Sequence, residues 1–398
     1  MELFIQMGHN MQTLAIEHLE EFDGGTIILS PMNISPNKVK DYAAKVHKKN
    51  GRVLVDPQLY YPRQYQKKLS EYEYWPQSDI TSLEMGQFDT VVEKLSKLNA
   101  EVRAEAFLLP SITTKKIDEL WNKIQKLIIK SAQKYAPDMK YIHTISLGSD
   151  VLNDERQIER VIEYVEEWDV DGIYIVCEHP ERYYLVDRPL WISNIMSLVA
   201  GIKRQRKMTI VGYASHQLLC MALAKCDAIA SGNFLNLRWF QPEHFETIDD
   251  RRPSRRAVWY YCPQALSEYK IPFLDIANRM ELLDRLAPPE TMKNRYSEML
   301  FNGSLPSSTG FGEKEAFRHY LYCLHKQCQN SVLETYEETK NLHLLMLETA
   351  EQLLSGLGKK GIKGQDRDFT EILDVNRAAI SAFDMSYSFP LSQEWKDI

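Results

Sequence analysis

The sequence predicts an α/β protein with a (β/α)8 barrel, or TIM barrel, that carries insertions on its catalytic face and a C-terminal helical appendage. Short β-rich runs alternate with amphipathic helical patterns. Eight such runs fall within about 230 residues, and the chain of 398 residues is longer than a minimal barrel of roughly 250. An open doubly wound sheet gives a similar alternation, but eight units in this length favour a closed barrel.

The predicted strands are short, and each of the first seven is followed by a helical pattern. In chain order they are Leu3–Gln6, Thr26–Leu29, Arg52–Val55, Ala106–Leu109, Tyr141–Ile145, Gly172–Cys177, Met208–Val211 and Asp227–Ala230. The pattern after the fifth strand is the clearest: Asn153 can cap a helix whose positive end suits Asp154 and Glu155. Apolar residues then recur at helical spacing at Ile158, Val161, Ile162 and Val165.

Two predicted loops are long, and both lie on the side where barrel enzymes carry their catalytic loops. Residues 57–88 are aromatic, with Tyr60, Tyr61, Tyr65, Tyr72, Tyr74 and Trp75. Residues 231–290 contain an arginine-rich stretch and then a strand-like run, Ala257–Cys262.

We assign residues 1–290 to the barrel with these insertions and residues 291–398 to a helical region. In that region helices extend to about residue 356, a Gly/Lys linker spans 357–366, and a last helix lies near 369–384.

Composition excludes several classes of protein. The chain is 44% apolar and 26% charged, which is ordinary for a globular protein, and its net charge of -7 argues against a generally basic surface. Met1–Ile5 lacks the features of a signal peptide, and no run of 18 apolar residues occurs, so we expect a cytoplasmic protein without membrane association. The six cysteines are dispersed through apolar segments, as reduced core thiols are.

Two carboxylates are the predicted catalytic residues because each lies at the end of a strand. Asp56 follows Arg52–Val55 directly, where partial desolvation at the barrel mouth would raise its pKa for acid/base chemistry. Glu178 follows Gly172–Cys177 and adds an ionisable group on a different strand. A loop hydrogen bond for Asp56 and an ion pair with Arg182 for Glu178 are the structural alternatives.

Further strand-end and loop residues are predicted to bind substrate. Glycine-containing turns at Gly212–Ser215 and Ser231–Asn233 can present backbone N–H groups to an anion. The substrate-binding candidates are Gln6, His9, Asn10, Tyr60, Tyr61, Arg63, Ser146, Asp150, His179, Tyr213, Ser231 and Asn233. Guanidinium groups near a mouth with tyrosines can hold phosphates while rings stack on bases, although an arginine run is often only a solvated loop. The phosphate-binding candidates are Arg238, Arg251, Arg252, Arg255 and Arg256.

No metal site or cofactor is predicted. Cys323, His325, Cys328 and His343 carry metal-binding atoms, but at 100° per residue the first three point around a helix instead of converging. Glycine-rich dinucleotide and P-loop patterns are absent from the sequence.

The order of these segments resembles the tRNA-guanine transglycosylase superfamily, including its DNA-acting relatives that exchange or excise bases. Over about residues 26–240, four segments are similar to family motifs: Arg52–Asp56 to the strand ending in an acid/base aspartate, Gly172–Pro180 to the strand ending in Gly-Glu-Pro, and Ile210–Leu219 followed by Ala224–Ala230. His319–Leu321 through His343 is similar to the family's C-terminal helical pair.

The sequence departs from this family at two positions. Ala230–Ser231 stands where the family places its covalent aspartate nucleophile, and Leu305–Ser308 stands in place of the cysteine-rich zinc motif before His319. Exchange of bases needs a nucleophile that holds the sugar, whereas hydrolytic excision can use water. The resemblance therefore implies an N-glycosylase that flips a modified nucleotide, in DNA rather than tRNA, into the barrel mouth. The related families also imply a role in defence against foreign DNA.

In this hypothesis Asp56 orients water or stabilises positive charge, Glu178 and Asn233 contact the base or sugar, and the loop at Tyr60 and Tyr61 stacks on the flipped nucleotide. Three alternatives stay open. They are a base-exchanging transglycosylase, a phosphosugar aldolase or isomerase with phosphate at the turns of Gly212 and Gly232, and a barrel that binds nucleic acid without catalysis. A lysine at a strand end would favour the second, and the eight runs contain none. The oligomeric state is left open.

Overall fold

The protein folds into a (β/α)8 barrel, described by a computed structural model for residues 1–62, 66, 68–76, 85–182, 184–245 and 257–398. Its parallel strands are β1 (Glu2–Gln6), β2 (Gly25–Leu29), β3 (Gly51–Val55), β4 (Phe107–Leu109), β5 (Tyr141–Leu147), β6 (Gly172–Cys177), β7 (Met208–Val211) and β8 (Ala228–Ser231). They pair in the order β3-β2-β1-β8-β7-β6-β5-β4. β3 and β4 are also neighbours, because the N–H of Glu105 donates to the carbonyl of Val53 at 2.8 Å. All eight predicted strands are confirmed.

The strands are readable in the sequence because most are buried on both faces. Every residue of β4, β5, β6 and β8 is buried. Side chains fill the barrel interior on one face of each strand, and surrounding helices cover the other face, so the runs are almost continuously apolar. The exposed positions lie at the amino-terminal ends, such as Glu2 and Arg52, which form an ion pair with each other.

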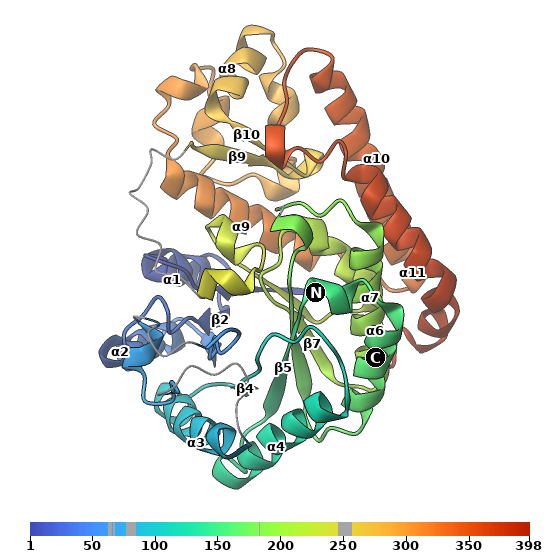
Figure 1. The fold of residues 1–398 in the computed structure, drawn as a ribbon. Coiled ribbons are helices and arrows are strands. Elements are labelled where there is room, and N and C mark those ends of the chain that lie inside the picture. Colours follow the sequence, from blue (N-terminus) through green and yellow to red (C-terminus); the bar gives the residue numbers. More distant parts are fainter. Residues whose placement is uncertain (63–65, 67, 77–84, 183, 246–256) are drawn as a thin grey trace.

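Helices follow the strands and surround the barrel (Figure 1). They are α1 (Gln12–Glu21), α2 (Pro36–His47), α3 (Met85–Val102), α4 (Glu119–Tyr135), α5 (Ser149–Leu152), α6 (Glu155–Glu166) and α7 (Pro189–Arg204). Between β7 and β8 the chain forms a 3-10 helix, η3 (His216–Ala224). The predicted cap of α6 is wrong by one residue. The carboxylate of Asp154 accepts from the N–H of Arg156, while Asn153 bonds back to Ser149 in α5.

The aromatic insertion after β3 is folded into the core. Among its described residues, Tyr60, Tyr72, Tyr74 and Trp75 are all buried. The hydroxyl of Tyr72 donates to the carbonyl of Ile34 at 2.8 Å, and that of Tyr74 donates to the carbonyl of Pro57 at 2.9 Å. These contacts attach the insertion to the carboxyl ends of β2 and β3.

The insertion after β8 and the C-terminal helices form an appendage beyond and beside the barrel (Figure 1). An antiparallel pair, β9 (Trp259–Cys262) and β10 (Ser267–Lys270), precedes α8 (Ile271–Arg279), and β9 confirms the extra strand predicted there. The C-terminal helices are α9 (Glu313–Gln329), α10 (Tyr336–Gly358) and α11 (Leu373–Glu394). α11 packs against α7 and continues ten residues past its predicted end, with Pro390 inside it.

Short 3-10 helices make up most of the remaining connections. They are η1 (Leu69–Glu71), η2 (Pro180–Arg182), η4 (Leu235–Leu237), η5 (Pro242–Phe245), η6 (Pro263–Ala265), η7 (Leu283–Leu286), η8 (Glu290–Met292), η9 (Glu298–Phe301), η10 (Pro306–Ser308) and η11 (Gln365–Arg367). The six cysteines are buried free thiols. Within the described ranges, none of the helices has the length and apolar character needed to cross a membrane.

Candidate active site

Asp56 lies at the carboxyl end of β3 and is the centre of a buried hydrogen-bond network. Its side chain has no exposed surface. Oδ1 accepts from the N–H of Gln58 at 3.0 Å and from the hydroxyl of Tyr60 at 2.8 Å. Oδ2 accepts from the hydroxyl of Tyr213 at 3.0 Å and from Nε2 of Gln6 at 3.3 Å. The ends of three strands, β1, β3 and β7, thus direct donors at one carboxylate.

The surroundings of Asp56 favour proton transfer near neutral pH. Burial raises the pKa of Asp56 to about 6, although the bonds from Tyr60, Gln58, Tyr213 and Gln6 each act to lower it. Burial also raises the pKa values of Tyr60 and Tyr213 well above their ordinary range, so both remain hydroxyl donors. A carboxyl group with a pKa close to the working pH, held by fixed donors, is suited to general acid/base catalysis.

A second layer of side chains holds these donors. Oε1 of Gln6 accepts from the hydroxyl of Tyr174, which points inward from β6, at 2.9 Å. The side chain of Gln58 bonds to Ser30 at the end of β2 through Nε2 at 2.8 Å. Gly212 leaves room for the ring, because a Cβ there would lie 2.4 Å from the hydroxyl of Tyr174. The glycine after β7 is therefore explained by packing, and Tyr174 and Gln58 are site residues that the sequence reasoning missed.

Two of the four donors have strained backbones. Gln58 and Tyr213 have φ values of 55° and 52°, in the left-handed region. A bulky residue such as tyrosine rarely adopts this conformation, and it persists only where the surrounding structure enforces it. Such strain at two contacts of one buried carboxylate is typical of a functional site.

Four buried rings pack around this network, and we name them the aromatic plate: Tyr60, Tyr213, Phe240 and Phe245. The ring centroid of Tyr60 lies 5.0 Å from that of Phe240 and 5.1 Å from that of Phe245, both edge to face. Tyr213 lies 5.3 Å from Phe240. The sequence analysis expected Tyr60 to stack on a nucleotide, but here its ring is inside the plate and its hydroxyl bonds to Asp56. Tyr61 is partly exposed.

Glu178, the second predicted catalytic residue, lies half-buried at the end of β6. Its Oε2 accepts from the N–H of Ser149 at 2.9 Å. Burial raises the pKa of Glu178, and the bond from Ser149 opposes that shift. The carboxylate therefore lies against the start of α5, at the same end of the barrel as Asp56.

His179 is a structural contact of the plate. Burial lowers its pKa to about 3, so the imidazole is neutral at ordinary pH. Its Nδ1 accepts from the backbone N–H of Phe240 at 3.2 Å, and the backbone N–H of His179 donates to the carbonyl of Phe240 at 3.0 Å. His179 was predicted to contact substrate, but in the structure it bonds to the backbone of Phe240 and holds that residue in place.

The other predicted substrate-binding residues are distributed around the barrel end. Ser146 is buried and bonded to Thr113 at 2.8 Å, and Asn233 is buried with its Oδ1 on the N–H of Phe234. Ser231 is buried at the end of β8. The exposed ones are His9, Asn10 and Asp150. Arg63 lies outside the described residues.

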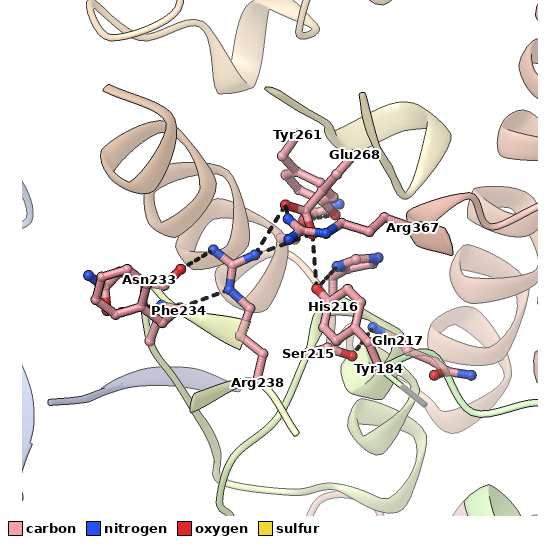
Figure 2. A network of polar contacts seen from close by, with 12 residues as sticks. Tyr184, Ser215, His216, Gln217, Asn233, Phe234, Arg238, Tyr261, Glu268 and Arg367 are labelled. Atoms are coloured by element: carbon pink, nitrogen blue, oxygen red, sulfur yellow. Dashed lines mark hydrogen bonds and ion pairs between the residues drawn. The ribbon is translucent and has the colours of Figure 1, made fainter. Parts of the chain in front are cut away.

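Arg238 is placed in the interior instead of on a phosphate-binding surface. Its side chain is 3% exposed, and its guanidinium pairs with Glu268 of β10 at 3.3 Å (Figure 2). The predicted contact with nucleic-acid phosphate does not fit this position, because the charge is already neutralised inside the protein. Arg251, Arg252, Arg255 and Arg256 lie outside the described residues.

The cysteine and histidine residues of the C-terminal region make separate contacts. His325 bonds to His18 of α1 at 3.1 Å, and His343 bonds to the carbonyl of Ser331 at 3.0 Å. Among the residues that the structure describes, no three histidine, cysteine or acidic side chains form a group that could hold a metal ion.

Comparisons with known proteins show no sequence relationship. No protein-family model and no curated protein matches the chain. Solved structures with similarity include a GH10 protein from Paenibacillus barcinonensis (8% identity, TM-score 0.36, 57% of this chain and 82% of that one). A GH10 xylanase from Thermobacillus composti has 9% identity and a TM-score of 0.37 over 58% and 85% of the two chains. N-acetylneuraminate lyase from Mycoplasma synoviae has 13% identity and a TM-score of 0.31 over 82% and 97%. The resemblance to tRNA-guanine transglycosylases stays a prediction.

Proposed function

We propose that the protein is an enzyme that hydrolyses an N-glycosidic bond, with Asp56 as its acid/base residue and a modified nucleotide of DNA as its substrate. The observation that carries this proposal is the buried Asp56 carboxyl, held by four donors at the barrel mouth, with a pKa raised to about 6. Barrel enzymes place their chemistry at this end of the strands. The preference for DNA comes from the sequence resemblance.

The proposed reaction breaks the bond between C1′ of the sugar and a nitrogen of the base. Positive charge develops at the sugar as that bond lengthens, and a carboxylate beside it stabilises the charge. Asp56 then takes a proton from the attacking water, the water oxygen bonds to C1′, and the base leaves with a proton. Glu178 lies at the same barrel end with a raised pKa, which fits a proton donor to the leaving base.

The residues around Asp56 suit a planar heterocycle. Gln6 and Gln58 provide side-chain amide groups that can read the edge of a base, and the rings of the aromatic plate can pack on its faces. In the structure these amides bond to protein groups, and Asp56 is covered. A base must therefore displace part of the plate when it binds.

The test is incubation of the purified protein with normal DNA, base-modified DNA and tRNA, followed by mass spectrometry of released bases and an assay for abasic sites. Release of a modified base with formation of abasic DNA supports the proposal. Release only when a second free base is supplied would instead indicate exchange. Absence of release from every nucleic acid in the panel would contradict the proposal.

A second candidate, a barrel that binds nucleic acid without catalysis, is favoured by one observation. Every donor around Asp56 already has a partner within the protein, as in a network that only stabilises a fold. Binding of DNA that is the same for the native protein and Asp56→Ala, with no base released by either, would support this second function.

A further inference from the structure

Glu268 is a buried charged residue that the proposed chemistry does not use. It lies on β10 of the appendage, and 2% of it is exposed. Its carboxylate accepts from Nη1 of Arg238 at 3.3 Å, from Nη1 of Arg367 at 2.8 Å and from the hydroxyl of Tyr184 at 3.2 Å (Figure 2). Burial alone would raise the pKa of Glu268, but the guanidiniums of Arg238 and Arg367 outweigh it and hold that pKa below its ordinary value. Glu268 is therefore ionised inside the protein.

Arg238 connects this charge to the end of β8. Its Nε donates to the carbonyl of Gly232 at 2.9 Å, and its Nη2 donates to the carbonyl of Asn233 at 2.8 Å. The guanidinium also lies 3.3 Å from the ring centroid of Tyr320 on α9. The side chain thus holds the turn after β8 from within, and Figure 2 shows it reaching from that turn toward Glu268.

The same segment carries two rings of the aromatic plate. Phe240 follows Arg238 by two residues, and Phe245 ends η5 shortly after it. His179 holds the segment at Phe240 through the two bonds described above, and Nε2 of Gln241 donates to the carbonyl of His179 at 2.5 Å. His179 thus holds the segment at Phe240 and Gln241, and the pair of Arg238 with Glu268 holds it at the turn after β8. The ring of Phe234 also packs on that of Phe317 in α9, with centroids 4.9 Å apart.

We propose that Glu268 is a positioning residue for the Asp56 site: through Arg238 it holds the segment Gly232–Phe245, and so the aromatic plate, over the carboxyl group. A guanidinium left in this interior without its carboxylate has lost both its water and its counter-charge. Arg238 then moves toward solvent and releases the turn after β8. The appendage in this way controls whether Asp56 is covered, which deepens the proposed function by linking substrate access to the contact between barrel and appendage.

The state of the plate can be read from the titration of Asp56. The ionisable groups next to Asp56 among the described residues are Tyr60, Tyr74, Tyr174 and Tyr213, and burial raises the pKa of each well above its ordinary value. They stay neutral when Asp56 titrates. Because burial is the largest cause of the raised pKa of Asp56, withdrawal of Phe240 and Phe245 should return that pKa from about 6 toward the ordinary 3.8.

The experiment is a pH titration of aspartate-labelled protein by carbon NMR, with the Asp56 signal identified by its loss in Asp56→Asn. In the native protein the Asp56 signal is expected to titrate with a midpoint of about 6. Glu268→Gln should lower it by about one unit or more. The matched control is Arg367→Met, which removes the other cation from Glu268 but leaves the bonds of Arg238 to the turn, and should leave the midpoint in place.

Arg238→Lys is the second variant, because it keeps the positive charge beside Glu268 but loses the donors to Gly232 and Asn233. It should also lower the midpoint, and circular dichroism should show a native fold. An Asp56 midpoint that stays at about 6 in folded Arg238→Lys or Glu268→Gln would overturn the inference. The titration needs no substrate. A failed search for base release would therefore contradict the proposed function, whereas the positioning role of Glu268 is tested independently by the Asp56 midpoint.

Discussion

Replacing Asp56 with asparagine is expected to change the stability of the protein in a pH-dependent way. The folded protein holds the pKa of Asp56 at about 6, against an ordinary value of 3.8, because the side chain is buried. A raised folded-state pKa means that folding favours the protonated form. The resulting stability is fully present below about pH 4 and is lost as the pH rises through about 6.

The size of this effect follows from the gap between the two pKa values. At about 1.4 kcal/mol per unit, the full contribution of this residue is about 3 kcal/mol, of which the native protein loses about 2.5 kcal/mol of unfolding free energy between pH 4 and pH 7. Asparagine cannot ionise, so the unfolding free energy of Asp56→Asn does not decrease with pH through this position. Its amide places N–H groups next to two of the four donors. This lowers the unfolding free energy of Asp56→Asn by an amount that does not depend on pH. The stability of Asp56→Asn relative to the native protein should therefore rise by about 2.5 kcal/mol between pH 4 and pH 7.

Urea unfolding at half-unit steps from pH 4 to pH 7, followed by tryptophan fluorescence, measures this difference. Asp150→Asn is the matched control, since it changes an exposed carboxyl group near another strand end and should show no comparable rise. A difference between Asp56→Asn and the native protein that is constant, or that falls as the pH rises, would refute the reasoning.

Two further substitutions test the network around Asp56. Tyr213→Phe removes one of its donors, so the pKa of Asp56 should rise further and the acidic limb of a pH–rate profile for base release should move to higher pH, with a rate about tenfold lower at pH 7. Gly212→Ala would place a Cβ 2.4 Å from the hydroxyl of Tyr174. It should reduce the unfolding free energy by about 1–3 kcal/mol in urea, and an unchanged denaturation midpoint would show that the ring moves aside freely.

Most of the barrel could be predicted because its strands are buried on both sides and therefore read as apolar runs. The carboxyl ends of those strands also identified Asp56, Gln6 and Tyr213 as site candidates, since a barrel gathers its strand ends at one mouth. A helical pattern was also predicted after the seventh strand, and the chain there forms a 3-10 helix, η3, whose nine residues are all buried, so the pattern gave the helical segment but not its 3-10 form.

The missed residues depend on tertiary structure. Tyr174 lies inside a strand and looks like a core residue, and Gln58 reaches its position only through a left-handed backbone. Arg238 was predicted to bind phosphate, and the sequence did not reveal its ion pair because its partner, Glu268, lies 30 residues later on a strand of the appendage. The contacts of Tyr174, Gln58 and Arg238 join residues that are far apart in the sequence or depend on an unusual backbone conformation. No local sequence pattern predicts such contacts, so they become visible only in the folded chain.

The most direct test of the central claim, that Asp56 carries the chemistry, is the rate of base release by the native protein and by Asp56→Asn at pH 7 on the best substrate from the nucleic-acid panel. Loss of an acid/base residue typically costs about 10²–10⁴ in rate. We expect a loss of this size in Asp56→Asn while its fold remains native. Release by Asp56→Asn at the native rate would contradict the assignment of Asp56 as the catalytic residue.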